Sequence, residues 1–129
     1  MASLEQRNHA RSFLRKSQEY FASAEDNLEM RRYTVAAGDA IHAGINAKDA
    51  IVVTTTKSRD HAVPAKELAR TLGTRANATV AVRALRELIS AKADVEYGTE
   101  LVEAAKATAL VRRARTVVEL AVQIVKLGR

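Results

Sequence analysis

Hydrophobic side chains recur at intervals of three and four residues along most of the chain, the spacing that keeps them on one face of an α-helix. Ser3 and Gln6 stand where a capping box would open the first helix, over residues 3–31. Its inward stripe consists of Ala10, Phe13, Leu14, Ser17, Phe21, Ala24 and Leu28. Residues 34–54 repeat the pattern with smaller side chains, which would let a neighbouring helix approach closely. We therefore expect a long first helix and a second helix at the centre of the molecule.

The helical pattern resumes after a break in the middle of the chain. The sequence VVTTTKSRDHAVP combines β-branched and turn-forming residues and predicts the longest loop. Pro64 suits the first turn of a short third helix that ends at Gly73. A fourth helix is predicted over residues 77–97, with an inward stripe of Val82, Leu85, Leu88, Ile89, Lys92 and Val95. The fifth helix is expected to begin near Glu100, after a threonine cap, with a stripe of Leu101, Ala104, Thr108, Val111, Ala114, Val118, Ala121 and Val125.

These five segments predict an all-α fold, an antiparallel up-and-down bundle of about five helices with a four-helix-bundle core. The composition agrees, because 47% of the residues are hydrophobic yet there are only two Phe, no Trp, five Gly and one Pro. Such a mixture favours helices over sheets. A chain of 129 residues is about one domain in length, so we expect a single helical domain over residues 1–129.

Several classes of protein are disfavoured by what the sequence lacks. The absence of cysteine excludes disulfides and thiolate metal sites. The three histidines are scattered, at positions 9, 42 and 61, so neither a metal site nor another cofactor is expected. The first residues contain no apolar stretch of signal-peptide length, and no window of 18 residues is free of charge. We expect a cytoplasmic protein without a membrane partner.

The formal charge of +6 and the pI near 10 permit an anionic partner such as RNA or a nucleotide. The 21 Lys and Arg residues are interleaved with 15 acids, so most of them are interpreted as solvated helix faces. The densest basic patch is formed by Arg112, Arg113 and Arg115. Two interpretations of this patch are open, contact with phosphate and the frame of a dimer interface.

Four segments together resemble one known family. They are YTVAAGDAIHAGINAKDAIV, the loop with SRDH, LRELISAKADVEYG and LVEAAKATALVRRARTVVELAV. Their order and spacing resemble the HEPN domain, an α-helical bundle that is widespread in prokaryotes. The likeness covers nearly the whole chain, and it includes the Ala-rich second helix, a histidine that opens the third segment, and Lys92 with Tyr97 at the end of the fourth helix.

The resemblance implies a homodimer formed through the long helices. It also implies a role in toxin–antitoxin, phage-defence or RNA-processing systems, in some cases beside a nucleotidyltransferase-type partner protein. Catalytic members are metal-independent ribonucleases in which four to six residues separate an arginine from a histidine. Paired arginines can hold the scissile phosphate while the histidines act as acid and base. Here the nearest preceding arginines leave one, nine and one residues before His9, His42 and His61, so this motif is not found.

The end of the fourth helix offers the first pair of candidate site residues, Lys92 and Tyr97. In the functional interpretation Tyr97 stacks on a base and Lys92 supplies a point charge for a phosphate. In the structural interpretation both side chains cover the edge of the core and their polar ends reach partners near the helix terminus, while Asp94 and Glu96 are solvated. The structural interpretation is preferred, because a helix end favours a cation for local reasons alone.

The loop before the third helix offers the second pair, Arg59 and His61, which would bind an anion together with the N-terminal amides of that helix. The structural interpretation, again preferred, is that Ser58 or Asp60 caps the helix and His61 lies in its first turn. On the second helix, His42 is interpreted as a packed or interface histidine. The neighbouring polar pair of Lys48 and Asp49 is interpreted as a subunit contact.

Two function classes follow. The first, which we favour, is a noncatalytic HEPN-like binding or interaction module that is dimeric and binds RNA, a nucleotide or a protein partner in a stress, toxin–antitoxin or defence context. The alternative is a metal-independent, RNA-cleaving HEPN ribonuclease whose non-standard active site is drawn from Arg59, His61, Lys92 and Tyr97. The missing motif argues against an enzyme. The dimer is also expected because a monomer would leave part of the fifth helix's apolar stripe exposed.

Overall fold

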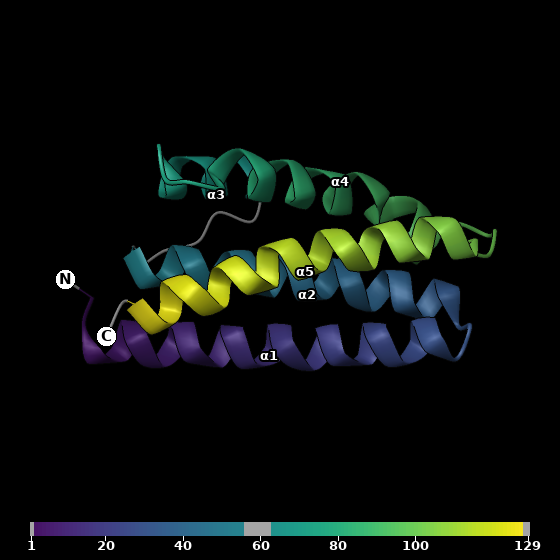
Figure 1. Ribbon diagram of the computed structural model, residues 1–129, viewed down its shortest axis with the longest axis horizontal. Coiled ribbons are helices and arrows are strands. Elements are labelled where there is room, and N and C mark those ends of the chain that lie inside the picture. The colour runs from purple at the N-terminus through teal and green to yellow at the C-terminus, as the bar shows by residue number, and fades with distance from the viewer. Residues whose placement is uncertain (1, 56–62, 128–129) are drawn as a thin grey trace.

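The computed structural model describes residues 2–55 and 63–127, and within them the chain forms helices and turns with no strand. The helices are α1 (Leu4–Glu29), α2 (Tyr33–Thr55), α3 (Pro64–Leu72), α4 (Ala78–Tyr97) and α5 (Ala104–Leu127). They pack together into one bundle, which confirms the predicted all-α fold (Figure 1). No helix of the described ranges is long and apolar enough to cross a membrane.

The two middle helices of the bundle are α2 and α5. Figure 1 shows them between α1 on one side and the pair of α3 and α4 on the other. The α2 helix contacts all four other helices, and α5 contacts α1, α2 and α4. Successive long helices run in opposite directions, and the short α3 lies beside α4 (Figure 1). This is the antiparallel, up-and-down arrangement that the short connections predict.

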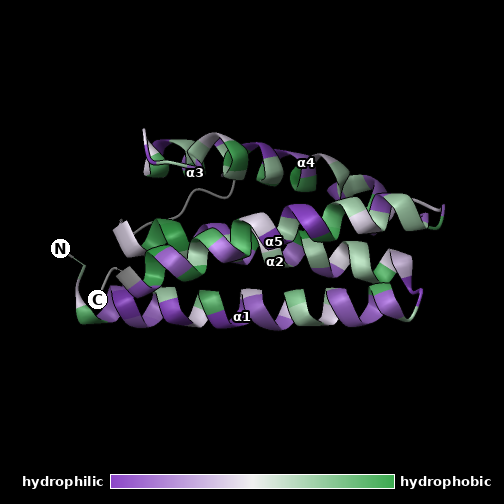
Figure 2. Ribbon diagram, viewed as in Figure 1, coloured by the Kyte–Doolittle hydropathy of each residue, from purple (hydrophilic) through white to green (hydrophobic). Residues whose placement is uncertain are grey.

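The α2 helix is enclosed along most of its length, as its small apolar residues predict. From Ala36 to Val53 nearly every turn contributes buried side chains, most of them Ala, Ile or Val. Gly44 marks a close approach to α4, because a Cβ added there would lie 2.5 Å from Cδ1 of Leu88. The surface helix α1 differs, since hydrophilic residues dominate its exposed side (Figure 2).

The helix ends confirm one predicted cap. Ser3 and Gln6 form the capping box, with the Gln6 backbone N–H donating to Ser3 Oγ at 3.1 Å and the Ser3 N–H donating to Gln6 Oε1 at 3.1 Å. The α3 helix begins at Pro64 after Val63, which provides no side-chain cap. The predicted caps, Ser58 and Asp60, lie outside the described residues.

The start of α5 differs from the prediction. The helix begins at Ala104 rather than near Glu100, because the chain continues irregularly after Gly98, whose backbone is extended. Leu101, predicted to face inward, therefore lies in the connection and is 85% exposed. The backbone N–H of Val102 donates to Thr34 Oγ1 at 2.9 Å, and this bond fixes the connection against the start of α2.

From Ala107 onward, the apolar stripe of α5 is covered within the single chain. Its buried members are Ala107, Leu110, Val111, Ala114, Val117, Val118, Leu120, Ala121, Ile124 and Val125. The expectation that a monomer would leave part of the predicted stripe exposed holds only at its start, where Leu101 and Ala104 are exposed, and the stripe is covered from Ala107 onward. The contacts of α5 with α1, α2 and α4 explain the burial, because three neighbours surround the apolar side of the helix.

Candidate nucleic-acid interface

The polar side chains in the last turns of α4 point in different directions. Glu96 turns towards α2, where its Oε1 lies 3.0 Å from Nε2 of His42. Lys92 is half-buried, whereas Tyr97 is 79% exposed and lies at the end of the helix. Five residues correspond to a rotation of about 140° around a helix, so Lys92 and Tyr97 face different sides of α4. The structure does not bring these two candidates together. The other two, Arg59 and His61, lie outside the described residues.

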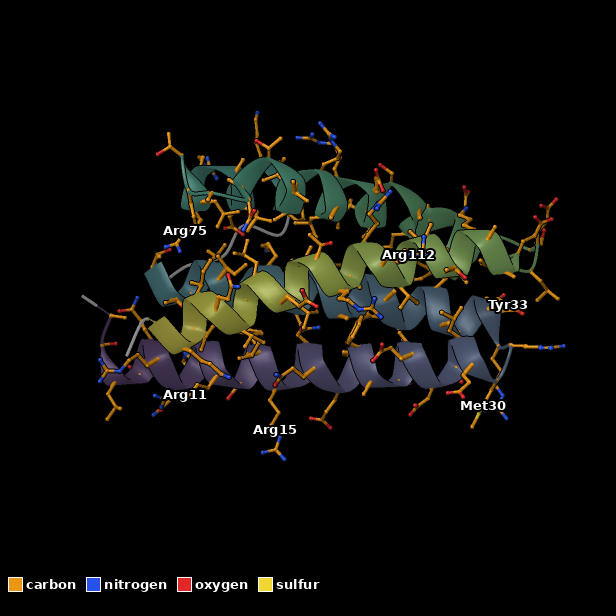
Figure 3. All side chains as sticks on the ribbon, viewed as in Figure 1. Arg11, Arg15, Met30, Tyr33, Arg75 and Arg112 are labelled. Carbon is orange, nitrogen blue, oxygen red and sulfur yellow. The ribbon has the colours of Figure 1, made fainter. Side chains whose placement is uncertain are left out.

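The three arginines of the predicted basic patch also diverge. Arg113 forms an ion pair with Glu87 of α4, and Arg115 Nη2 lies 2.9 Å from Glu25 Oε2 of α1. Arg112 is exposed on α5, in the middle of the face seen in Figure 3, and forms no ion pair with a described residue. Two of the three charges are thus neutralised by helices on opposite sides of α5, and a single arginine of the patch stays available to an external anion.

A second group of cations, absent from the candidates chosen from the sequence, lies on the solvent face of α4. Arg83 and Arg86 are exposed, one helical turn apart, and neither forms an ion pair with any residue that the structure describes. A shallow groove separates α4 from α5 here. It is lined by Ser90 of α4 and by Lys106 of α5. Lys106 is exposed and likewise has no ion-pair partner in the described ranges. This group has the residue types and the exposure that phosphate binding requires.

The charge of the side chains that line the groove changes from positive to negative along its length. Arg83 and Arg86 mark one end, beside Glu87, whose carboxylate is paired with Arg113. A second hollow adjoins the other end, and Asp94 and Lys106 line both hollows. That second hollow is lined by the α4–α5 connection, including the carboxylates of Glu100 and Glu103. An anionic ligand would therefore bind at the arginine end and avoid the connection.

The excess positive charge of the protein belongs to the second half of the chain. Residues 1–55 contain seven Lys or Arg and seven Asp or Glu, whereas residues 63–127 contain eleven and seven. Residues 1–55, which include α1 and α2, are thus formally neutral. Most of the excess in residues 63–127 lies on α5, whereas α4 carries three basic and three acidic residues. This division could have been counted in the sequence, but the exposed position of the α4 arginines depends on which face of the helix is buried.

The polar residues of α2 are bound to the neighbouring helices. Asp39 Oδ2 accepts hydrogen bonds from Ser23 Oγ at 2.6 Å and from Asn27 Nδ2 at 3.2 Å, both on α1. His42 packs against Tyr20 of α1 with the ring centroids 5.2 Å apart, in addition to its contact with Glu96. These contacts agree with a packed histidine, but 43% of the His42 side chain is exposed, so the alternative of an interface histidine stays a prediction.

Deeper in the same helix, a charged cluster is buried. Lys48 is fully buried, and its Nζ lies 2.8 Å from Glu67 Oε1 of α3 and 2.5 Å from Asp49 Oδ1. Asp49 is 3% exposed and Glu67 is 6% exposed. The predicted subunit contact of Lys48 and Asp49 is therefore wrong, because both side chains lie inside the bundle. Their ion pairs join α3 to α2 and leave no surface for a ligand.

Comparison with known proteins does not assign this chain to a family. No protein-family model matches the sequence, and a search of curated proteins finds no match. Within the described residues, no group of three or more His, Asp or Glu side chains is arranged to hold a metal ion. The candidate site is therefore defined by the structure alone, as the exposed cations Arg83, Arg86 and Lys106 of α4 and α5.

Proposed function

We propose that this chain is a noncatalytic RNA-binding module whose contact surface is the solvent face of α4 and the groove between α4 and α5. The observation that carries the proposal is that Arg83, Arg86 and Lys106 are exposed and form no ion pair with a described residue. By contrast, Arg113 and Arg115 are each paired with a carboxylate of a neighbouring helix. Cations without an internal partner can neutralise phosphates at little cost, because no ion pair has to be broken.

The resemblance to HEPN domains supports this function on independent grounds, since many members of that family act on RNA. It also supports the further proposal that the chain works in a two-component stress, toxin–antitoxin or defence system, beside a nucleotidyltransferase-type partner protein. Because the Arg-to-His motif is missing, we propose binding without cleavage. The RNA-cleaving alternative, with Arg59, His61, Lys92 and Tyr97, is separated from binding by following the integrity of the RNA.

The proposal is tested with a labelled, mixed-sequence, single-stranded RNA in metal-free buffer at low and moderate salt. The wild-type protein is expected to retain intact RNA at low salt and to lose it as salt rises. Arg83→Ala/Arg86→Ala should weaken retention, whereas Arg31→Ala/Arg32→Ala, which removes the same charge from the exposed turn after α1, should have little effect. Cleaved RNA would overturn the noncatalytic assignment, and absence of retention at low salt would overturn RNA binding.

We also propose a homodimer, now through α1 rather than through an exposed stripe of α5. The first half of α1 carries Arg7, Arg11, Arg15 and Lys16, and its second half carries Glu19, Glu25, Asp26 and Glu29. Figure 3 shows Arg11 and Arg15 pointing away from the bundle. Antiparallel pairing of two α1 helices about a two-fold axis would place each basic half against an acidic half. With the two-fold axis between Gln18 and Glu19, Arg11 would lie opposite Asp26 of the second copy.

Sedimentation of the wild type and of charge-reversed variants tests the dimer. Arg11→Asp should weaken association, and the swap Arg11→Asp/Asp26→Arg should restore it, because symmetry makes the two positions partners. A wild-type protein that is monomeric at micromolar concentration would contradict the dimer. The RNA proposal does not depend on this result, since its cations lie on α4 and α5.

A further inference from the structure

The exposed tyrosine at the end of α4 lies in line with the exposed arginines of the same helix. Tyr97 follows Arg86 by eleven residues, which is three helical turns, so their directions differ by only about 20° and they are about 16 Å apart along the axis. Ser90, small and exposed, lies between them on the solvent face. The aromatic ring and the cations therefore lie along one continuous strip of the surface.

Tyr97 has no internal role that would explain its position. Its side chain is 79% exposed, and its hydroxyl forms no hydrogen bond with a described residue. The other tyrosines differ, since Tyr20 packs against His42 and Tyr33 is half-buried. An exposed ring in line with unpaired cations is an arrangement on which proteins stack unpaired bases while basic side chains hold the backbone.

The carboxylates at the end of α4, where Tyr97 lies, favour a base over a phosphate at this end of the strip. Asp94, Glu100 and Glu103 line the hollow at the end of α4, and Lys106 is the cation among them. Carboxylates repel a phosphate, but they do not oppose a neutral base on an aromatic face. The ligand's backbone should therefore run over Arg83 and Arg86, and a base should reach Tyr97.

We infer that the strip formed by Arg83, Arg86, Ser90 and Tyr97 recognises single-stranded RNA, with an unpaired base stacked on Tyr97. This inference rests on the RNA-binding function proposed above and specifies its ligand. A duplex keeps its bases paired and stacked within the helix, so it offers Tyr97 no free base. At the rise of a stacked strand, the 16 Å between Arg86 and Tyr97 corresponds to about five nucleotides.

The test compares a labelled 12-nucleotide single strand with the same strand annealed to its complement, by fluorescence anisotropy at low salt. Tyr97→Ala should lower affinity for the single strand by about 5- to 150-fold and leave duplex affinity unchanged. Tyr97→Phe should retain most of the affinity, because the ring is kept. Leu101→Ala is the matched control, since this side chain is also exposed at the same end of the bundle but cannot stack. An unchanged affinity in Tyr97→Ala would overturn the inference.

A second measurement reports stacking directly. The chain contains no tryptophan, so Tyr97→Trp introduces a single indole that can be excited selectively. The single strand should quench the emission of this indole and the duplex should not. Emission that is unchanged by the single strand would contradict the inference.

The RNA-binding proposal and the base-stacking inference can be contradicted separately. If Arg83→Ala/Arg86→Ala loses RNA affinity and Tyr97→Ala does not, the RNA-binding proposal is supported and the base-stacking inference is contradicted. Absence of all binding at low salt removes both.

Discussion

The helices α2 and α4 carry similar polar residues but use them in opposite ways. On α2 the charged side chains are held inside the bundle. Lys48 contacts Asp49 of the same helix and Glu67 of α3, and Asp39 is bound by Ser23 and Asn27 of α1. On α4 the exposed arginines have no internal partner. The reason is position, because α2 is surrounded by four helices whereas α4 has a solvent face. Charges on α2 therefore act on folding, whereas the exposed arginines of α4 remain available for binding.

The largest effect is expected where α2 loses its buried cation. Lys48→Met should lower the free energy of unfolding by about 3–5 kcal/mol, because it removes one partner of a buried ion cluster. Urea denaturation measures this change, with exposed Lys16→Met as a control that should stay within about 0.5 kcal/mol. RNA affinity of the folded variant should not change. A loss of stability below about 1 kcal/mol would contradict the role assigned to the cluster.

The contact between α2 and α4 can be examined with two glycines of the same helix. In Gly44→Ala the new Cβ would crowd Leu88, and overpacking costs about 1–3 kcal/mol, of which helix propensity offsets about 1. We expect a net loss of up to about 2 kcal/mol. Gly38→Ala is the matched control, because its Cβ would meet Val95 at 3.9 Å, an ordinary contact, and it should stabilise by up to about 1 kcal/mol. Equal effects at both positions would show that the close approach is unimportant.

The smallest change in stability is expected on α4. Arg83→Ala/Arg86→Ala should leave the free energy of unfolding within about 0.5 kcal/mol of the wild type, since both side chains are exposed and unpaired. Thermal or urea unfolding measures this difference. A large destabilisation would mean that these arginines support the fold, and the contrast with α2 would disappear.

Much of the fold follows from the spacing of apolar residues, because helical periodicity states which side of each helix is buried. The central position of α2 follows from its small residues, and the start of α1 from the capping box. The start of α5 could not be predicted in the same way. Leu101 continues the apolar spacing, but the extended backbone at Gly98 delays the helix, and spacing alone does not reveal this.

The candidate site was less accessible to prediction from the sequence. Arg112, Arg113 and Arg115 stand together in the sequence, yet residues on a helix point outward at about 100° intervals, so neighbours face different partners. The availability of a charge depends on side chains from distant segments, such as Glu25 and Glu87, and these pairings arise only on folding. Tyr97 was found by its position beside a glycine stop. Its alignment with Arg86 follows from their spacing, but the exposure of both side chains depends on which face of α4 is buried.

The salt dependence of RNA affinity tests the central claim most directly. Affinity for a single-stranded RNA is measured at several salt concentrations for the wild type and for Arg83→Ala/Arg86→Ala. If both arginines contact phosphates, the slope of log affinity against log salt should become shallower by about 1.4 in the variant. The Arg31→Ala/Arg32→Ala control should keep the wild-type slope. An identical slope in wild type and α4 variant would show that the unpaired cations of α4 do not bind the RNA backbone.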